Sequence, residues 1–373
     1  MKEIFQPITM AEDSSTYYSI KDSLINIDFN KPQQASLFDY FSHIELINLE
    51  TKDNVLIGNP AEIIHYQNRY FIFDRQQHRI FVFNDEGKFL FQINKRGHGP
   101  GEYAEIRSLL INPYTKNLDV FVVGSKGSII SYDISGKHVN TSRLFVHPAY
   151  FALNFIILNE KTYVFYLIIR KESNTFGIHY YDIEDNKILF QDYEADPFFA
   201  TFISFSPRSH TPFYEYHGKW YFYHFADNVT YEIGPKSLIK AYTWGFGGRN
   251  FDAKNLNLPN DPASIRTLHT MYFQDQNNRY LMALIRLPNS LTDDCLIYDK
   301  STGNCKYVKR FIETVDFLPR KVTNDYVLSW CYHGALENFV TEDMLTEVNR
   351  KKFKDLKKSK DEMNPIIIKY HFK

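Results

Sequence analysis

The residues best suited to chemistry gather in one short segment, NKRGHGPGEYAEI at Asn94–Ile106. Backbone N–H groups of glycine-rich loops can cradle phosphate, and charged side chains beside them can contact a polar ligand. The segment lacks the Gly-Lys-Ser/Thr ending of a P-loop. No helical pattern follows its glycines, so it is not a dinucleotide-binding loop either. What remains is the lip of a binding site, carried by Arg96, His98 and Glu102, or a corner where the chain turns.

A second glycine-rich segment favours the corner. The sequence TWGFGGRNF follows a predicted strand in the same way, and Gly97 and Gly245 lie 148 residues apart. A motif that recurs at a fixed period is better explained by the path of the chain than by catalysis. Glycine allows tight backbone geometry there, and Pro100 stiffens the crossing.

Other reactive residue types form no recognisable site. The 13 histidines show no His-x-x-x-His pattern, and no Gly-x-Ser-x-Gly elbow is present. Asp293 and Asp294 could form a metal or acid pair, but adjacent acids in a loop are more often solvated. Cys295 and Cys305 flank a predicted hairpin and could pair across it, although unpaired, packed thiols are the favoured interpretation. We expect no cofactor and no metal.

Composition favours a large all-β fold. The 373 residues include 32 Phe and 27 Tyr, and aromatic side chains suit the half-buried surface of a sheet. The net charge of −1 gives no general attraction to nucleic acid or to an anionic membrane. The first residues, MKEIFQPITMAEDSS, lack the apolar core of a signal peptide. The most apolar segment, 151–170, is interrupted by polar residues, so we expect two strands there and no membrane span.

The chain repeats itself. An aromatic residue followed by a tight polar turn recurs in FNDEGKFL, YDISGKHV, YDIEDNKIL, YEIGPKSLI and YDKSTGNCKYV. The leading aromatics, Phe83, Tyr132, Tyr181, Tyr231 and Tyr298, are spaced 49, 49, 50 and 67 residues apart. The last gap holds GRNFDAKNLNLPNDPAS, a predicted loop.

Each turn lies between two strand-like segments, and another precedes them, as in RYFIFD, LDVFVVG, TYVFYLI, KWYFYHFA and RYLMALIR. A four-stranded unit of about 40–50 residues matches a propeller blade, which must stack against neighbours to bury its faces.

The count of units predicts a six-bladed β-propeller of four-stranded antiparallel blades, formed by one domain over residues 1–373. The chain ends on PIIIKYHFK, the third strand of blade six, which leaves that blade without an outer strand and with a bare edge. The candidates to fill it are SLINIDF, within an N-terminal extension at residues 1–40, and HIELINLE, with Ile44–Glu50 favoured. Residues 341–360 read as a helical insertion in blade six, capped by Thr341, with Val348 among its apolar residues.

Three segments resemble a known family. INLETKDNVLIGNPAEI, GKFLFQINKRGHGPGEY and DEMNPIIIKYHFK are similar to the blade-one entry, the Gly-x-Gly-Pro-Gly-Glu-Tyr signature and the ending of six-bladed β-propeller proteins exported by Bacteroidetes. The matches bracket roughly residues 40–373. The resemblance implies NHL-like architecture and export to the periplasm or, as a lipoprotein, to the outer membrane or cell surface, with the signal segment absent from the given chain. It implies no activity that can be transferred to residues.

In a propeller, the loops between second and third strands share one face with the crossings between blades, around the mouth of the central channel. Arginine forks there could bind carboxylate or phosphate, and aromatic rings could stack on sugars or cations. We expect a ligand at this mouth, although each residue could instead belong to a solvated loop. The candidate residues are Arg75, His78, Arg96, His98, Glu102, Arg170, Arg208, Arg249, Arg286 and His333.

The leading functional interpretation is a non-catalytic propeller of the bacterial cell envelope that binds a small molecule, a glycan or an envelope protein, as a monomer. The glycan follows only from the family's setting. One alternative is a metal-assisted lyase or lactonase-type enzyme at the channel mouth. Another is a structural subunit of an envelope complex that uses the helical insertion as its contact. The sequence leaves all three open.

Overall fold

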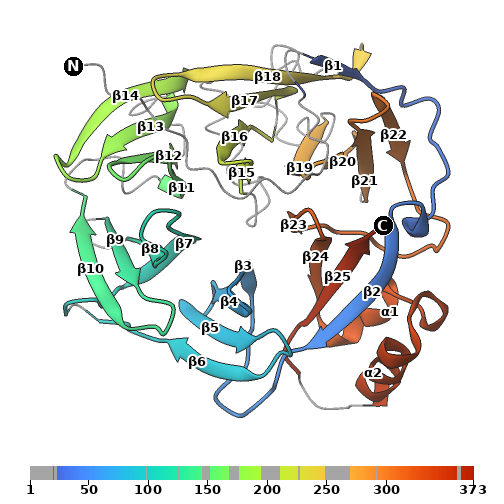
Figure 1. The fold of residues 1–373 in the computed structure, drawn as a ribbon, viewed down its shortest axis with the longest axis horizontal. Helices are drawn as coiled ribbons and strands as arrows, with labels where there is room; N and C mark the ends of the chain where they lie inside the picture. The colour runs from blue at the N-terminus through green and yellow to red at the C-terminus, as the bar shows by residue number, and fades with distance from the viewer. Residues whose placement is uncertain are drawn as a thin grey trace.

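The structure is a computed structural model. It describes residue 20 and residues 23–97, 99–123, 127–144, 152–167, 176–194, 211–225, 227–247, 269–290, 292–358 and 363–373. Six sheets, each built on four antiparallel strands, stand in a ring around a central opening, and one of them has a fifth, parallel strand (Figure 1). The predicted six-bladed β-propeller is therefore confirmed. The predicted loops at residues 170–174, 194–210 and 248–264 lie wholly or almost wholly outside the described residues.

The strands of each blade are given in order from the channel to the rim. Blade one consists of β3 (Pro60–Tyr66), β4 (Arg69–Asp74), β5 (Arg79–Asn84) and β6 (Phe89–Ile93). Blade two consists of β7 (Glu105–Ile111), β8 (Leu118–Val123), β9 (Ser128–Tyr132) and β10 (His138–Arg143). Blade three consists of β11 (Ala152–Ile157), β12 (Thr162–Leu167), β13 (Phe176–Asp182) and β14 (Lys187–Glu194).

The second half of the ring repeats this order. Blade four consists of β15 (Phe213–Tyr216), β16 (Lys219–Tyr223), β17 (Val229–Ile233) and β18 (Leu238–Gly245). Blade five consists of β19 (Thr270–Gln276), β20 (Tyr280–Arg286), β21 (Asp293–Asp299) and β22 (Asn304–Val308). Blade six consists of β23 (Lys321–Val322), β24 (Tyr326–Cys331), β25 (Ile366–Phe372) and β2 (Phe41–Asn48).

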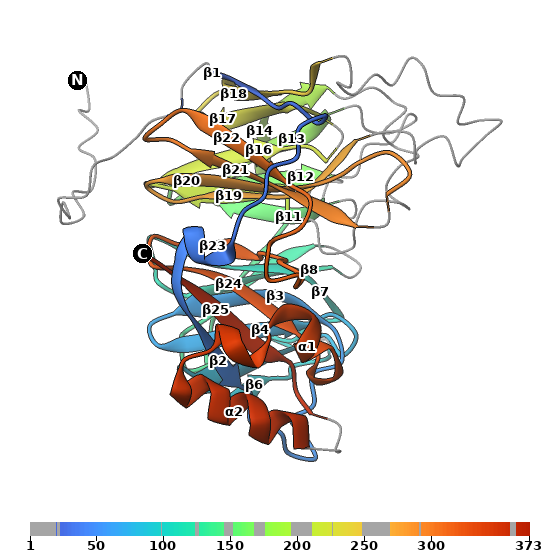
Figure 2. The ribbon, with the colours of Figure 1, turned by 90° about the vertical axis from the view of Figure 1, so that its right-hand side faces the viewer.

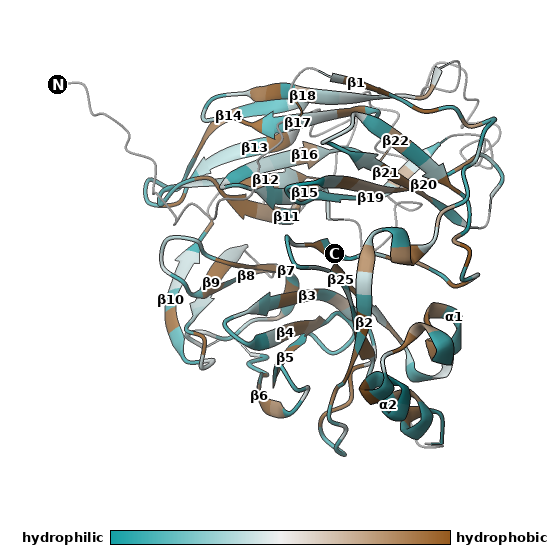
Figure 3. Ribbon diagram, turned by 45° about the vertical axis from the view of Figure 1, so that its right-hand side comes forward, coloured by the Kyte–Doolittle hydropathy of each residue, from teal (hydrophilic) through white to brown (hydrophobic). Residues whose placement is uncertain are grey.

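The middle strands carry the core. Every residue of β8 and of β12 is buried, as their near-continuous apolar sequences predict. Stretches of brown run along the blades in Figure 3, whereas the side of helix α2 that faces the viewer is largely teal. The predicted turns between third and fourth strands are confirmed, since Gly87, Gly136 and Gly303 have φ values of 80°, 84° and 72°.

The two ends of the chain share blade six. Strand β2 pairs antiparallel with β25, with Leu46 opposite Ile368, and supplies the missing outer strand. The closure prediction is confirmed for the favoured segment, although the strand begins three residues earlier and ends at Asn48. In Figure 1 the blue β2 lies beside the red β25.

The other candidate strand, SLINIDF, has its own place. Its first residues form β1 (Ser23–Asn26), which pairs parallel with β18 as a fifth strand on blade four. The chain then crosses blade five, where Gln33 N–H donates to Tyr307 O at 2.8 Å, before it enters blade six. The N-terminal strap, defined as residues 23–48, therefore ties blades four, five and six together.

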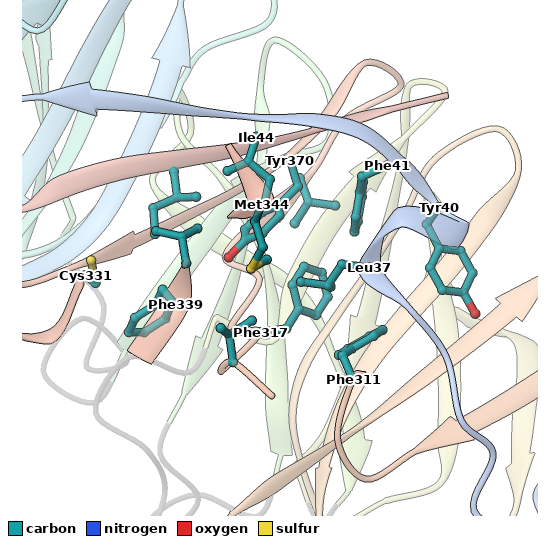
Figure 4. Close-up of a cluster of buried hydrophobic side chains, with 14 of the residues drawn as sticks. Leu37, Tyr40, Phe41, Ile44, Phe311, Phe317, Cys331, Phe339, Met344 and Tyr370 are labelled. Carbon is teal, nitrogen blue, oxygen red and sulfur yellow. The ribbon is translucent and has the colours of Figure 1, made fainter. Parts of the chain in front are cut away.

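A hydrophobic seam anchors this strap between blades five and six (Figure 4). Leu37 and Phe41 are at most 1% exposed. The Phe41 ring lies 5.7 Å from Phe317 and 5.5 Å from Tyr370, so residues from the strap, the blade crossing and the last strand share one cluster. Burial of each such side chain contributes about 1.5–3 kcal/mol to folding. Within the described residues all three cysteines, including Cys295 and Cys305, are free thiols.

Helix α2 (Glu347–Lys358) covers the edge of blade six and lies outside the ring (Figure 2). The Asn349 side chain accepts from Leu46 N–H at 3.0 Å, and Lys352 Nζ donates to Leu46 O at 3.1 Å. The helix therefore satisfies backbone groups that an edge strand would otherwise leave bare.

The helical insertion is confirmed, but two details of its prediction are wrong. A short 3₁₀ helix at Glu342–Met344 follows Thr341, so Thr341 precedes this turn and not α2. Val348 is 68% exposed, because the buried face of α2 is formed by Asn349, Phe353 and Leu356. The short helix α1 (Leu336–Phe339) precedes this insertion.

Candidate functional site

The described residues line a central channel with a volume of about 2680 Å³. Residues of β3, β7, β11, β15, β19 and β23 line it, so all six blades contribute. Each of these strands begins at a blade crossing and ends at the turn to its neighbour. The channel consequently has an upper mouth, on the side of the crossings, and a lower mouth, on the side of those turns.

A β-bulge recurs near the upper mouth in four of the inner strands. The pairing register slips once in β3, β7, β11 and β19, at Ala61, Arg107, Leu153 and Tyr272. A bulge turns one side chain out of the regular alternation, and bulges are common beside binding sites. In blade five the displaced residue is an aromatic that lines the channel.

The ring of Tyr272 makes a cation–π contact with an arginine. The Arg286 guanidinium lies 4.5 Å from the ring centre, and Arg286 Nε donates to Asp293 Oδ1 at 2.8 Å. Burial lowers the pKa of Arg286, but the bonds to Asp293 and Tyr272 outweigh burial and raise it. All three residues line the channel and stay partly accessible to solvent. The arginine is thus held in place by two partners while it faces the channel.

Blade six supplies a second stacked arginine next to the first. The Arg320 guanidinium lies 5.6 Å from the Trp330 ring, and both residues line the channel. Asp293 attracts Arg320 as well as Arg286. We define the arginine arc as Tyr272, Arg286, Asp293, Arg320 and Trp330, which together present two guanidinium groups, one carboxylate and two aromatic rings at the upper mouth.

A carboxyl group stands in the channel wall of blade one. Glu62 Oε2 accepts from Leu109 N–H at 3.1 Å, whereas Oε1 is buried and has no partner among the described residues. Burial raises the pKa of Glu62 to about 7, against the opposing effects of the Leu109 bond and of the nearby Arg75. A carboxyl with such a pKa can accept or donate a hydrogen bond near neutral pH.

The lower mouth contains a chain of polar groups between blades one and six. Tyr326 OH lies 2.6 Å from His65 Nδ1, and His65 Nε2 bonds to Asp85. The order resembles a nucleophile, base and orienting acid. Burial, however, raises the pKa of Tyr326 to about 12, which keeps the phenol protonated. The chain fits a link between the first and last blades better than a reactive centre.

The described candidates from the sequence occupy different places. Arg286 lines the channel, and Arg75 lies close enough to Glu62 to influence its pKa. His78 accepts from Ile106 N–H through Nδ1 at 3.3 Å, so it belongs to the junction between blades one and two. His333 begins a 3₁₀ helix at His333–Ala335, and its Nε2 is buried without a partner among the described residues. The candidates outside the described residues are His98, Arg170, Arg208 and Arg249.

The glycine-rich segment forms a compact crossing between blades one and two. Glu102 Oε2 accepts from Gly99 N–H at 2.8 Å, and Tyr132 OH donates to Gly101 O at 2.7 Å. Arg96 forms a single bridge to Tyr103, which is 2% exposed. The segment therefore packs on the strands of blade two, as its architectural interpretation predicts, and the arginine arc lies on other blades.

Most of the arginine arc was not predicted. Tyr272, Arg320 and Trp330 carry no motif, and only their positions at strand ends could have placed them at the upper mouth. Asp293 and Asp294 do not act as a pair, because Tyr307 OH donates to Asp294 at 2.6 Å while Asp293 bonds to Arg286. Their alternation along β21 sends them to different partners.

Two further properties bear on the site. Among the residues that the structure describes, no three or more histidine, cysteine or acidic side chains cluster as metal ligands would. In the same part of the chain, no helix has the length and hydrophobicity needed to cross a membrane.

The family described as "Domain of unknown function (DUF4934)" matches residues 23–371. The chain belongs to the DUF4934 family. The match begins at β1 and ends within β25, so this DUF4934 protein is matched along the whole ring, including the N-terminal strap.

Solved structures support the same architecture. A protein from Bacteroides fragilis NCTC 9343 that is named as exported matches with a TM-score of 0.69 and 18% identity. The match covers 94% of this chain and 100% of that one. A DUF4221-family protein from Bacteroides vulgatus ATCC 8482 matches with a TM-score of 0.50 and 10% identity, over 89% of this chain and 98% of that one. At these sequence identities, the similarity between the DUF4934 chain and the two solved structures shows a shared fold and nothing more. No curated protein matches it.

Proposed function

We propose that this protein is a non-catalytic binding propeller of the bacterial cell envelope, which holds a ligand at the upper mouth of its channel. The observation that carries the proposal is the arginine arc, whose charged and aromatic groups are fixed by one another and line a channel of about 2680 Å³. Convergent polar groups in a large, preformed cavity are typical of ligand sites.

The proposed export and envelope location are supported by the name of one structural relative and by a sequence resemblance. The structural relative from Bacteroides fragilis is named as exported, and the sequence resembles exported propellers. The helical insertion gives less support to a scaffold role, because α2 uses Asn349 and Lys352 to cover the edge of β2. The surface of α2 that remains is mainly charged and solvated.

Fluorescence of Trp330 offers a direct test of binding at this mouth. Mixed pools of saccharides, peptides and small metabolites would be titrated into the purified protein, and the signal of a Trp330→Phe variant would be subtracted. We expect at least one pool to change the Trp330 signal in a saturable way. If no pool does so, and no pool raises the melting temperature, the proposed function is refuted.

A further inference from the structure

We propose that the lower mouth of the channel contains a second binding site, which takes a short, neutral saccharide. We name the site the lower platform and define it as Tyr114, Trp220 and the turn at residues 158–161. Blades two, four and three supply these residues in that order, and the three blades are neighbours in the ring (Figure 1). The lower platform shares no residue with the arginine arc, so the inference goes beyond the proposed function.

Both rings of the lower platform are fixed through their polar tips. Tyr114 OH donates to Leu158 O at 2.9 Å, and Trp220 Nε1 donates to Ile157 O at 3.1 Å. Because blades two and four lie on opposite sides of blade three, the two rings stand on either side of one turn. The protein satisfies both polar tips, so the rings offer a ligand their faces and not their hydrogen-bonding groups.

The ring faces remain accessible from the channel. Tyr114 packs on the core cluster of blades two and three, and Trp220 packs on that of blades three and four. Both side chains nevertheless line the channel and are partly exposed. In the described part of the chain, no other aromatic ring and no cation stacks on either of them. Each ring therefore provides an apolar surface that a ligand in the lower mouth can cover.

The repeat itself does not require an aromatic residue at Trp220. This residue lies two positions before Phe222, which pairs with Tyr231, the leading aromatic of the third strand. In the other five blades the same position holds an exposed polar or charged residue, namely Asn68, Lys116, Lys161, Arg279 and Asp325. A ligand that stacks on the indole explains this departure, whereas the architecture of the blade does not.

A buried polar group holds the turn that carries Tyr114. The side-chain oxygen of Asn112 accepts from Tyr114 N–H at 2.9 Å and from Thr115 N–H at 3.1 Å. The amide nitrogen of Asn112 donates to Asp119 Oδ2 at 2.9 Å, and Asn112 is only 6% exposed. Four residues lie between Asn112 and its partner Asn117, whereas the corresponding turns of the other blades hold two or three. The longest of these turns thus presents its ring in a fixed position, which lowers the entropy lost on binding.

The polar groups beside the rings include both donors and acceptors. Burial and, after it, the charge of Glu160 raise the pKa of the neighbouring phenol, so this carboxylate lies close to the ring. Glu215 is opposite Trp220 across the β15–β16 hairpin. Lys116 and the amide nitrogen of Asn159 are exposed donors on the adjacent turns. Hydroxyl groups both donate and accept hydrogen bonds, so a ligand rich in hydroxyls can use all four groups.

A saccharide fits this arrangement better than an organic cation or an apolar ring. Aromatic recognition of a cation uses rings that converge on one charge, whereas these rings are separated by a turn. An apolar ligand needs enclosure, whereas the lower platform lies at the open end of the channel. A sugar ring can place its C–H face on an aromatic ring and keep its hydroxyls in water. Since there are two rings, we expect linked sugar units to bind more tightly than a single one.

The experiment follows saccharide binding through the fluorescence of Trp220 in a Trp330→Phe background. The other remaining tryptophan, Trp244, is fully buried. The probes are maltotriose, cellotriose, laminaritriose, mannotriose and N-acetylchitotriose, each compared with its monosaccharide. We expect at least one trisaccharide to change the emission in a saturable way and to bind at least about tenfold more tightly than its monosaccharide. Because the ligand is neutral, its affinity should be the same in about 0.05 M and 0.5 M sodium chloride.

Calorimetry on variants of the chain locates the site. Trp220→Leu and Tyr114→Leu should each weaken binding at least about tenfold, because each removes one stacking surface. Tyr114→Phe keeps the ring and loses only the bond to Leu158, so it should weaken binding less. Tyr332→Ala is the matched control, because Tyr332 OH also donates to a carbonyl of the next blade, Gly58 O at 3.0 Å, but at the upper mouth. This control should leave the affinity unchanged.

Three results would overturn the inference. The first is that no saccharide of this panel changes the Trp220 signal. The second is that both leucine variants bind as tightly as the unmodified chain, which would place the saccharide elsewhere. The third is tighter binding of tetramethylammonium than of any saccharide, which would make the lower platform a cation site. Each of these results leaves the proposed function standing, because binding at the upper mouth is measured separately through Trp330.

Discussion

The side-chain oxygen of Asn364 accepts a hydrogen bond from the backbone N–H of Ile57 at 2.8 Å. The same amide donates to Glu50 O at 2.8 Å and to Val55 O at 2.6 Å. A single, fully buried side chain just before the last strand therefore organises the crossing from blade six to blade one.

Replacement of Asn364 by alanine should cost about 2–5 kcal/mol, because it leaves one buried N–H and two carbonyls without partners. Asn364→Asp should also destabilise, since a carboxylate cannot donate to the two carbonyls. Urea denaturation followed by circular dichroism would measure both. Asn140→Ala, at an exposed site on β10, is the control and should change stability by less than about 0.5 kcal/mol. Equal effects at the two sites would contradict this role for Asn364.

The two strands of the N-terminal strap, β1 and β2, should contribute separately to stability. Deletion of residues 1–29 removes β1 but leaves blade six complete, so we expect a melting temperature lower by several degrees with a single transition. Deletion of residues 1–48 also removes β2 and exposes the apolar edge of β25, so we expect loss of cooperative unfolding or aggregation. Scanning calorimetry distinguishes these outcomes. A normal transition for the longer deletion would show that β2 is dispensable.

Gly101 should tolerate no side chain. Its φ is +72°, and a Cβ atom would lie 2.6 Å from the His138 ring. Gly218 has the same φ but no heavy atom within 4 Å of its Cβ position. Gly218→Ala should therefore cost about 1–2 kcal/mol for the backbone alone, and Gly101→Ala about 1–3 kcal/mol more. The difference in unfolding free energy between the two variants measures the cost of the contact with the His138 ring. A difference near zero would mean that the crossing can shift to avoid this contact.

Glu62 should make stability depend on pH. Its pKa in the folded protein is about 7, above the ordinary value of 4.5. Between those values the folded state binds more protons than the unfolded state, so the stability that the proton provides is full below about pH 4.5 and is lost as pH rises to 7. Glu62→Gln should remove this slope and be more stable at pH 8 by about 1–3 kcal/mol.

Exposed Glu86→Gln is the control for Glu62 and should retain the wild-type slope. The measurement is the unfolding free energy in urea at several pH values from 4 to 8. If Glu62→Gln kept the full slope, the carboxyl would titrate normally and its burial would have no energetic effect.

Sequence reasoning succeeded where local chemistry repeats. Gly87, Gly136 and Gly303 mark turns because positive φ is costly for other residues, and the bare edge of PIIIKYHFK required a partner strand. It failed to predict the arginine arc because a one-residue bulge at Tyr272 decides which side chain meets Arg286. No residue type in β19 announces that bulge. The contact between Arg320 and Trp330 depends on how blades five and six meet, which only the closed ring specifies.

Pairing of β2 with β25 also determines when the ring can close during folding. Ser42 bonds to Phe372 O across 330 residues of sequence, among the longest loops that the chain can close. Closing such a loop costs roughly 5 kcal/mol of chain entropy before any contact compensates it. Until β25 has been synthesised, Ile44 and Leu46 have no native partner on that strand. The apolar strand β2 therefore stays unpaired during most of synthesis, and ring closure should be the slow, late step at which folding competes with aggregation.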